Sequence, residues 1–234
     1  MKKAALVVAG GIGSRMGSER PKQFLLLGGR PILMHTLDRY LQLDPRLPIQ
    51  LVLPKQEVKF WFEDAPQWFA ANELARIEVC EGGETRTHSV HKGLEALELR
   101  LFRPETYFVA IHDGVRPFIP SERLAEAFQI ASQRGASVAC VPVKSSMRQM
   151  NADGGSQAVD RSQFYHVQTP QTFSFKRILQ AYRDRPEGAF TDDASLYQAM
   201  GGDVVICMGS YDNLKITTPE DLLIAEQILA RWSK

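Results

Sequence analysis

The chain has 234 residues, with 28 Lys and Arg against 27 Asp and Glu. This length suits one α/β domain with a sizeable core, so we treat residues 1–234 as a single domain. The balanced charge argues against a nucleic-acid-binding protein, which usually carries a basic excess. No apolar run reaches the roughly 18 residues of a membrane span. Residues 1–3 lead into a short strand rather than a signal sequence, and Cys80, Cys140 and Cys207 lack metal-ligand spacing. We therefore expect free thiols, a cytoplasmic protein and no membrane partner.

Apolar runs and amphipathic segments alternate along most of the chain. In chain order we predict strand 4–9, helix 31–43, strand 49–53, helix 56–74 with a break near Pro66, strand 76–80, helix 85–99, strand 107–111, helix 121–134, strand 137–143, helix 174–183, helix 192–200, strand 204–207 and a last helix from about residue 218. Ser121 and Thr191 match helix N-caps. The alternation is typical of a mainly parallel sheet with helices on both faces.

Residues 144–166 interrupt this alternation. Asn151, Asp153, Gly154 and Gly155 form a turn signal between two short extended stretches. The pattern predicts a β-hairpin inserted between two elements of the sheet. We interpret the hairpin as a dimerisation arm, because it is long and no helix covers it. The alternative is an irregular surface loop.

The first predicted strand runs into a loop that carries two cations, Arg15 and Lys22. Small residues let a ligand approach the backbone closely and leave N–H groups free to face phosphate oxygens; here they are Ala9, Gly10, Gly11 and Gly13. The loop matches neither the Walker loop nor the dinucleotide fingerprint. We interpret it as a nucleotide-binding loop of another kind. The alternative is a pair of solvated surface cations.

Two further polar loops follow predicted strands. Because ligands bind at the carboxyl ends of parallel strands, we expect both loops near the first one. The turn at 82–84, Gly82-Gly83-Glu84, together with Ser89 could hold a base, or it could be an ordinary strand-to-helix turn. Asp113 ends a strand opposite the phosphate loop, which suits a Mg²⁺ ligand. The alternative for Asp113 is a turn-forming residue before Gly114.

The chain contains no nucleophile elbow and no zinc-protease motif. A reaction whose nucleophile is already an anion needs neither; a phosphomonoester attacking the α-phosphate of a nucleotide is an example. Positioning and charge neutralisation would then carry the catalysis. Lys215 lies between apolar residues in a predicted short strand, where a cation needs a partner such as a second phosphate.

Six segments in this order resemble the 2-C-methyl-D-erythritol 4-phosphate cytidylyltransferase family of non-mevalonate isoprenoid synthesis. They are residues 9–16 with 21–23, 82–86 with Ser89, 112–117, 168–171, 191–195 and 212–217. Each segment alone is a weak signal, but the ordered set is specific and covers nearly the whole chain. The resemblance implies a Rossmann-like fold of the nucleotide-diphospho-sugar transferase type.

The resemblance also implies a reaction. CMP would pass from CTP to 2-C-methyl-D-erythritol 4-phosphate, with Mg²⁺ bound and pyrophosphate released. The implied catalytic residues are Arg15, Lys22, Asp113 (also the metal ligand), Arg161 and Lys215. The implied CTP-binding residues are Ala9, Gly10, Gly11, Gly13, Gly82, Gly83, Glu84 and Ser89, and the implied acceptor-binding residues are Ser146, Arg161, Thr191 and Lys215. The family is homodimeric with embracing arms, so Arg161 would serve the partner's site.

Two departures from the family pattern keep other hypotheses open. Gly114 and Val115 stand where the family often has two alanines, and Ser145 stands where it often has Asp. Ribitol-5-phosphate cytidylyltransferases have Ala-Val at the first of these places and a similar first loop, but residues 159–162 and 191–195 fit the methylerythritol enzymes better. A third hypothesis is a non-catalytic nucleotide-binding protein, against which the intact cations of the site argue.

Overall fold

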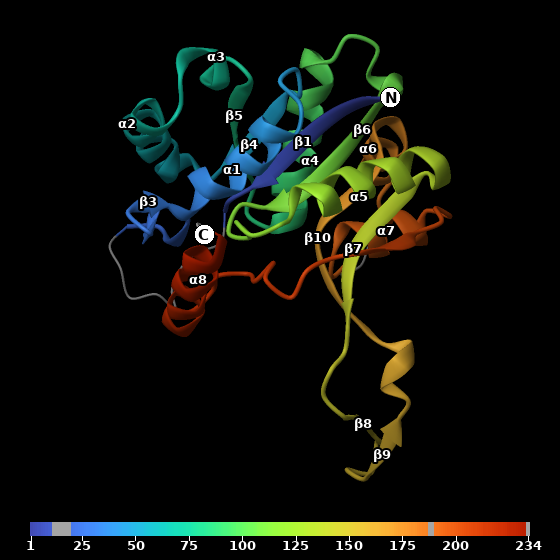
Figure 1. The fold of residues 1–234 in the computed structure, drawn as a ribbon. Coiled ribbons are helices and arrows are strands. Elements are labelled where there is room, and N and C mark those ends of the chain that lie inside the picture. Colours follow the sequence, from blue (N-terminus) through green and yellow to red (C-terminus); the bar gives the residue numbers. More distant parts are fainter. Residues whose placement is uncertain (11–19, 187–189, 233–234) are drawn as a thin grey trace.

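The computed structural model describes residues 1–10, 20–186 and 190–232 (Figure 1). The strands are β1 (Lys2–Val8), β2 (Leu26–Leu27), β3 (Arg30–Pro31), β4 (Ile49–Leu53), β5 (Ile77–Glu81), β6 (Tyr107–Asp113), β7 (Ala136–Pro142), β8 (Met147–Met150), β9 (Ser156–Val159), β10 (Tyr165–Ser174) and β11 (Val205–Met208). The α-helices are α1 (Ile32–Leu43), α2 (Val58–Trp68), α3 (Ala71–Leu74), α4 (Arg86–Arg100), α5 (Ser121–Arg134), α6 (Phe175–Arg183), α7 (Asp193–Ala199) and α8 (Pro219–Trp232). Short 3₁₀ turns are η1 (Lys22–Phe24), η2 (Lys55–Glu57), η3 (Pro104–Thr106) and η4 (Arg161–Gln163).

One sheet organises the described part of the chain, with the strand order β11-β7-β10-β6-β1-β4-β5. All neighbouring strands in it are parallel except β10, which runs antiparallel to both β6 and β7. The predicted mainly parallel sheet is therefore confirmed. We did not predict β10, because its middle is polar and contains Pro170. Those polar residues are buried all the same: Gln168, Thr169 and Gln171 hydrogen-bond to backbone atoms of the segment after β11, of β6 and of α7, respectively.

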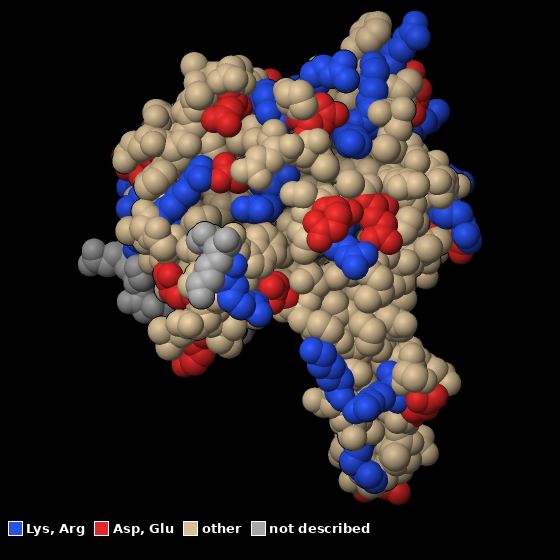
Figure 2. Space-filling view, viewed as in Figure 1, with Lys and Arg blue, Asp and Glu red and all other residues tan. Residues whose placement is uncertain are grey.

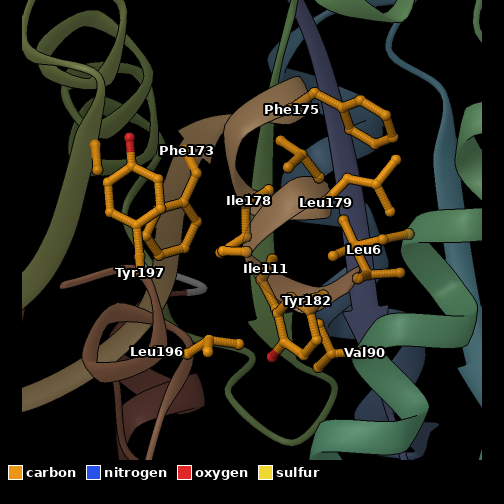
Figure 3. Packing of buried hydrophobic residues seen from close by; sticks show 14 of the residues in the cluster. Leu6, Val90, Ile111, Phe173, Phe175, Ile178, Leu179, Tyr182, Leu196 and Tyr197 are labelled. Carbon is orange, nitrogen blue, oxygen red and sulfur yellow. The ribbon is translucent and has the colours of Figure 1, made fainter. Parts of the chain in front are cut away.

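The two faces of the sheet are covered by different helices. Alternate residues of β1 point to opposite sides, as a pleated strand requires. Leu6 belongs to a core cluster with α4, α6 and α7, and Val7 belongs to a second cluster with α1 and α5. Figure 3 shows the first cluster, where Tyr182 of α6 lies beside Val90 and Ile111. This double-sided burial fixes the sheet, and with it the positions of the loops at its carboxyl edge.

The predicted β-hairpin is present in the structure. β8 pairs antiparallel with β9, and the backbone N–H of Asn151 donates to Gly155 O at 2.8 Å. The hairpin leaves the sheet after β7 and returns in β10, where Tyr165 pairs with Pro142. It projects away from the sheet and its helices (Figure 1). We call residues 144–166 the arm; Lys and Arg side chains are prominent on it (Figure 2).

Some local predictions were wrong. The predicted segment 56–74 does contain a break, but the break falls between α2 and α3, and α2 continues through Pro66 to Trp68. The N-cap of α5 is Pro120 rather than Ser121, and that of α7 is Asp192 rather than Thr191. The Asp192 side chain accepts from Ser195 N at 2.8 Å, because its carboxylate reaches the free N–H groups of the first turn. None of the helices in the described ranges is long and apolar enough to cross a membrane.

Candidate active site

A buried carboxylate surrounded by cations lies at the carboxyl edge of the sheet. Asp113 is the last residue of β6 and is 7% exposed. Its Oδ2 lies 3.0 Å from Lys215 Nζ and 3.4 Å from Arg116 Nε, and its Oδ1 lies 3.4 Å from Arg86 Nε. Burial alone would raise the pKa of Asp113, but Arg86, Lys215 and Arg116 outweigh it and hold the pKa well below its ordinary value. The carboxylate is therefore ionised throughout the physiological range.

Arg86 is held by the fully buried carboxylate of Asp193. The two terminal nitrogens of Arg86 donate to Asp193 Oδ1 at 3.0 Å and Oδ2 at 2.8 Å. The hydroxyl of Tyr182 donates to the same Oδ1 at 2.5 Å. Burial would lower the pKa of Arg86, yet Asp193 and Asp113 raise it above its ordinary value. A planar guanidinium in a bidentate pair has a fixed orientation, so Arg86 is a rigid cation at the site.

Two cavities meet at this charge cluster. The first has a volume of about 210 Å³ and is lined by Val8, Ala9, Gly10, Lys22, Gln23, Arg86, Ser89, Asp113, Val115 and Lys215. The second has a volume of about 270 Å³ and is lined by Arg86, Asp113, Arg116, Val167, Gln168, Thr169, Gln171, Thr191, Asp192 and Lys215. Arg86, Asp113 and Lys215 line both. Two molecules bound in the two cavities would thus meet at one carboxylate and two cations.

Gln23, which lines the first cavity, is held by two hydrogen bonds. The side-chain amide of Gln23, which follows Lys22, donates to Ala9 O at 2.8 Å and also to Glu57 Oε2. Gln23 therefore connects the end of β1 with η1, the two segments on either side of residues 10–21. Burial raises the pKa of Glu57 to about 7.

The turn before α4 needs glycine for steric reasons. A Cβ at Gly82 would lie 2.7 Å from Ser89 Oγ, and a Cβ at Gly83 would lie 2.5 Å from His88 Cβ. Ser89 Oγ accepts from Gly83 N at 3.0 Å, so the turn and the cavity wall are one hydrogen-bonded unit. Glu84 is exposed in the same turn.

The donor set fits a metal only in a limited way. The described residues contain no group of three or more His, Cys, Asp or Glu side chains placed to hold a metal ion. Among the described residues that line the first cavity, Asp113 is the single carboxylate. Mg²⁺ accepts one or two protein carboxylates when phosphate oxygens and water complete its shell. Asp113 therefore fits a Mg²⁺ ion that arrives with a polyphosphate.

Comparison with known proteins agrees with this geometry. Residues 3–231 match the family profile described as IspD, 2-C-methyl-D-erythritol 4-phosphate cytidylyltransferase. The enzyme of that name from Bacteroides thetaiotaomicron is 42% identical over 98% of this chain and 100% of its own length. The Porphyromonas gingivalis enzyme is 43% identical over 97% of this chain and 98% of its own. The chain belongs to the 2-C-methyl-D-erythritol 4-phosphate cytidylyltransferase family.

Solved structures in the cytidylyltransferase family share the fold. The 4-diphosphocytidyl-2C-methyl-D-erythritol synthase of Anaerococcus prevotii superposes with a TM-score of 0.83 at 28% identity, covering 98% of this chain and 96% of that one. The Thermus thermophilus cytidylyltransferase gives a TM-score of 0.73 at 30% identity, covering 99% of this chain and 100% of that one. The resemblance and the mainly parallel sheet with helices around it are thus confirmed, and the dimerisation role of the arm stays a prediction.

Seven of the predicted cytidylyltransferase residues line the two cavities, whereas Gly82, Gly83 and Glu84 line neither. Ala9, Gly10, Lys22, Ser89, Asp113 and Lys215 line the first cavity, and Asp113, Lys215 and Thr191 line the second. Gly11, Gly13 and Arg15 lie outside the described residues. Ser146 and Arg161 are exposed on the arm and line neither cavity. Arg161 donates to the backbone oxygen of Lys144, at the base of the arm.

Sequence reasoning missed several residues of the site. Arg86 and Asp193 stand only within the segments 82–86 and 191–195, to which the sequence assigns no separate role for either residue. Arg86 is the first residue of α4, and Asp193 directly follows the N-cap Asp192 of α7. The sequence shows both residues, but only the fold brings them together. Lys215 was wrongly expected in a strand: it lies in an irregular segment, and its partner within the chain is Asp113.

Proposed function

We propose that this chain transfers CMP from CTP to 2-C-methyl-D-erythritol 4-phosphate. The acceptor's phosphate oxygen attacks the α-phosphorus of CTP, a new phosphorus–oxygen bond forms, and the bond to the bridging oxygen breaks. The products are the cytidine diphosphate derivative and pyrophosphate. The observation that carries the proposal is the pair of cavities that share Arg86, Asp113 and Lys215. The relatives that this chain matches over nearly their whole length are named as this enzyme.

The side chains that line the two cavities suit this chemistry without a protein nucleophile or base. A phosphomonoester is already an anion, so the site has to align it and offset repulsion between phosphates. Lys22 in the first cavity is suited to the leaving phosphates, and Lys215 and Arg86 are suited to the oxygens of the reacting phosphorus. Arg15 is proposed as a further cation for the same charge. Thr191 in the second cavity is proposed to bind the acceptor.

The nucleotide is proposed to occupy the first cavity. Ala9, Gly10, Gly11 and Gly13 would follow its phosphates, and Gly82, Gly83, Glu84 and Ser89 would hold cytosine. The support is the tight turn before α4, in which Ser89 and Gly83 are hydrogen-bonded. Asp113 is proposed to hold Mg²⁺ bound to the phosphates. When bound, this ion would withdraw charge from the phosphate oxygens.

The active molecule is proposed to be a homodimer in the cytoplasm. The projecting arm supports a dimer, because Ser146 and Arg161 line neither cavity of their own chain. These two residues are therefore proposed to complete the acceptor site of the partner subunit. The three cysteines are free thiols, which supports a reducing compartment.

The proposal is tested by pyrophosphate release from CTP and Mg²⁺, with 2-C-methyl-D-erythritol 4-phosphate and ribitol 5-phosphate as parallel acceptors. We expect release with the first acceptor and at least about tenfold less with the second, one decade being 1.4 kcal/mol of discrimination. Release with ribitol 5-phosphate alone would contradict the proposed acceptor. Tight CTP binding with no release from either acceptor would favour a non-catalytic nucleotide-binding protein.

A further inference from the structure

We propose that Asp193 is a positioning residue for the transfer step. It holds the guanidinium of Arg86 where the two cavities meet and prevents Arg86 from pairing fully with Asp113. The inference rests on the proposed function, because it deepens the role of the same site.

The first argument is that Arg86 has two carboxylate neighbours and favours one of them. Its terminal nitrogens lie 2.8 and 3.0 Å from Asp193, whereas its Nε lies 3.4 Å from Asp113. Bidentate pairing of terminal nitrogens is the strong arrangement for Arg and a carboxylate. Among the described residues, Arg86 contacts two carboxylates, those of Asp193 and Asp113. Without Asp193, the terminal nitrogens of Arg86 would pair with Asp113. Asp193 therefore leaves the oxygens of Asp113 more accessible to a ligand in the cavities.

The second argument is that Asp193 acts only through other groups. It is 0% exposed and lines neither cavity, so it cannot touch a bound substrate. Arg86, in contrast, lines both cavities with 32% of its side chain exposed. A buried carboxylate costs free energy unless it is paired. Asp193 is paired with Arg86, one of the two cations that line both cavities.

The third argument is that Asp193 is itself held rigidly. Tyr182, whose ring packs beside Val90 and Ile111 in Figure 3, donates its hydroxyl to Asp193 Oδ1. The next residue, Ala194, donates its N–H to Gln171 Oε1 at 2.8 Å, which ties α7 to β10. Thr191, two residues before Asp193, lines the second cavity. One turn thus anchors Arg86 and carries a side of the acceptor cavity.

The test is a double-mutant cycle between Asp193→Asn and Arg86→Gln. For each variant, kcat and KM are measured in the transfer assay and the Kd for CTP by calorimetry. Since a misplacement of about 1 Å can cost about 100-fold, we expect Asp193→Asn to lower kcat about 10- to 100-fold and raise the CTP Kd about 3- to 10-fold. In the Arg86→Gln background, Asp193→Asn should add less than about twofold to either loss.

Asp38→Asn is the matched control, because it removes the carboxylate of another bidentate pair, Arg30–Asp38, whose residues line neither cavity. We expect its kcat within about threefold of the wild-type value, since the loss of that pair leaves Arg86 in place. Equal losses in Asp38→Asn and Asp193→Asn, or losses that add in the cycle, would overturn the inference. An Asp193→Asn protein that loses thermal stability and keeps the wild-type kcat would also overturn the inference.

Two provisions keep the inference testable. If Asp193→Asn does not fold, Arg86→Lys replaces it, because lysine keeps the charge and cannot pair in a bidentate way. Retention of more than half the wild-type kcat would then refute the need for a fixed guanidinium. If the wild type releases no pyrophosphate, the proposed function fails, and the cycle in CTP Kd still decides the role of Asp193.

Discussion

The edge of the sheet around Asp113 and the arm place their charged side chains in different ways. At the sheet edge the charges pair with one another: Asp113 lies among three cations, and Arg86 is fixed by Asp193. On the arm, Arg161 is exposed and donates to the backbone oxygen of Lys144 on the same arm. Contacts within the chain fix the first geometry, whereas the second is proposed to be completed by a partner subunit. The predictions below test this difference, beginning with the largest expected effect.

Lys22→Ala should lower kcat at least about 100-fold and weaken CTP binding less than about tenfold. Lys22 lines the first cavity, and charge on the leaving phosphates increases most in the transition state. Steady-state kinetics and calorimetry with CTP measure the two effects. Lys55→Ala is the control, because Lys55 is an exposed lysine of η2 that lines neither cavity. Equal losses in kcat and CTP affinity for Lys22→Ala would mean that Lys22 binds only ground-state phosphate.

The arm prediction concerns two subunits. Arg161→Ala alone should be strongly impaired while the dimer persists, and deletion of residues 147–159 should give monomers by light scattering. Lys22→Ala and Arg161→Ala proteins, unfolded and refolded together, should regain about one quarter of wild-type activity per subunit, because half the dimers are mixed and each mixed dimer has one intact site. No recovery would place Arg161 in the site of its own subunit, and an unchanged dimer after the deletion would refute the role of the arm.

The sequence predicted what depends on local pattern. Alternating apolar residues placed most elements of the sheet, and the turn at 151–155 gave the hairpin. The polar and glycine-rich loops that follow predicted strands placed Lys22, Ser89 and Asp113 at one edge of the sheet from the sequence alone. Long-range partners could not be predicted: Asp193 meets Arg86 107 residues away, and the buried polar residues of β10 hydrogen-bond to backbone atoms of β6, of α7 and of the segment after β11. Such pairing depends on tertiary contacts, which the periodicity of the sequence does not predict.

Glu57 tests the cost of a buried charge beneath the site. The folded-state pKa of Glu57, raised by burial from 4.5 to about 7, means that the folded protein binds more protons than the unfolded chain between these pH values. Its contribution to the free energy of unfolding is therefore full below pH 4.5 and is lost as pH rises through 7. Relative to Glu57→Gln, the wild type should lose about 1–3 kcal/mol between pH 4.5 and 8.

Urea denaturation of both proteins across this range measures the Glu57 difference. Other titrating groups are common to the two proteins and cancel, and Glu57→Gln keeps an oxygen that can accept from Gln23. Glu63→Gln, on the exposed surface of α2, is the control. A difference between wild type and Glu57→Gln that does not change with pH would show that Glu57 ionises as a solvated carboxylate does.

The smallest effect separates the arm from the sheet and its helices directly. Thr85 caps α4 by accepting from His88 N at 3.1 Å, and Asp160 caps η4 on the arm by accepting from Ser162 N at 3.0 Å. Thr85→Ala should lower the free energy of unfolding by about 1 kcal/mol, with Thr85→Ser as the control that keeps the cap. Asp160→Ala should leave the main unfolding transition unchanged, because an exposed hairpin opens locally. Equal losses in urea denaturation would mean that the arm folds as one cooperative unit with the sheet, and its geometry would then be fixed without a partner.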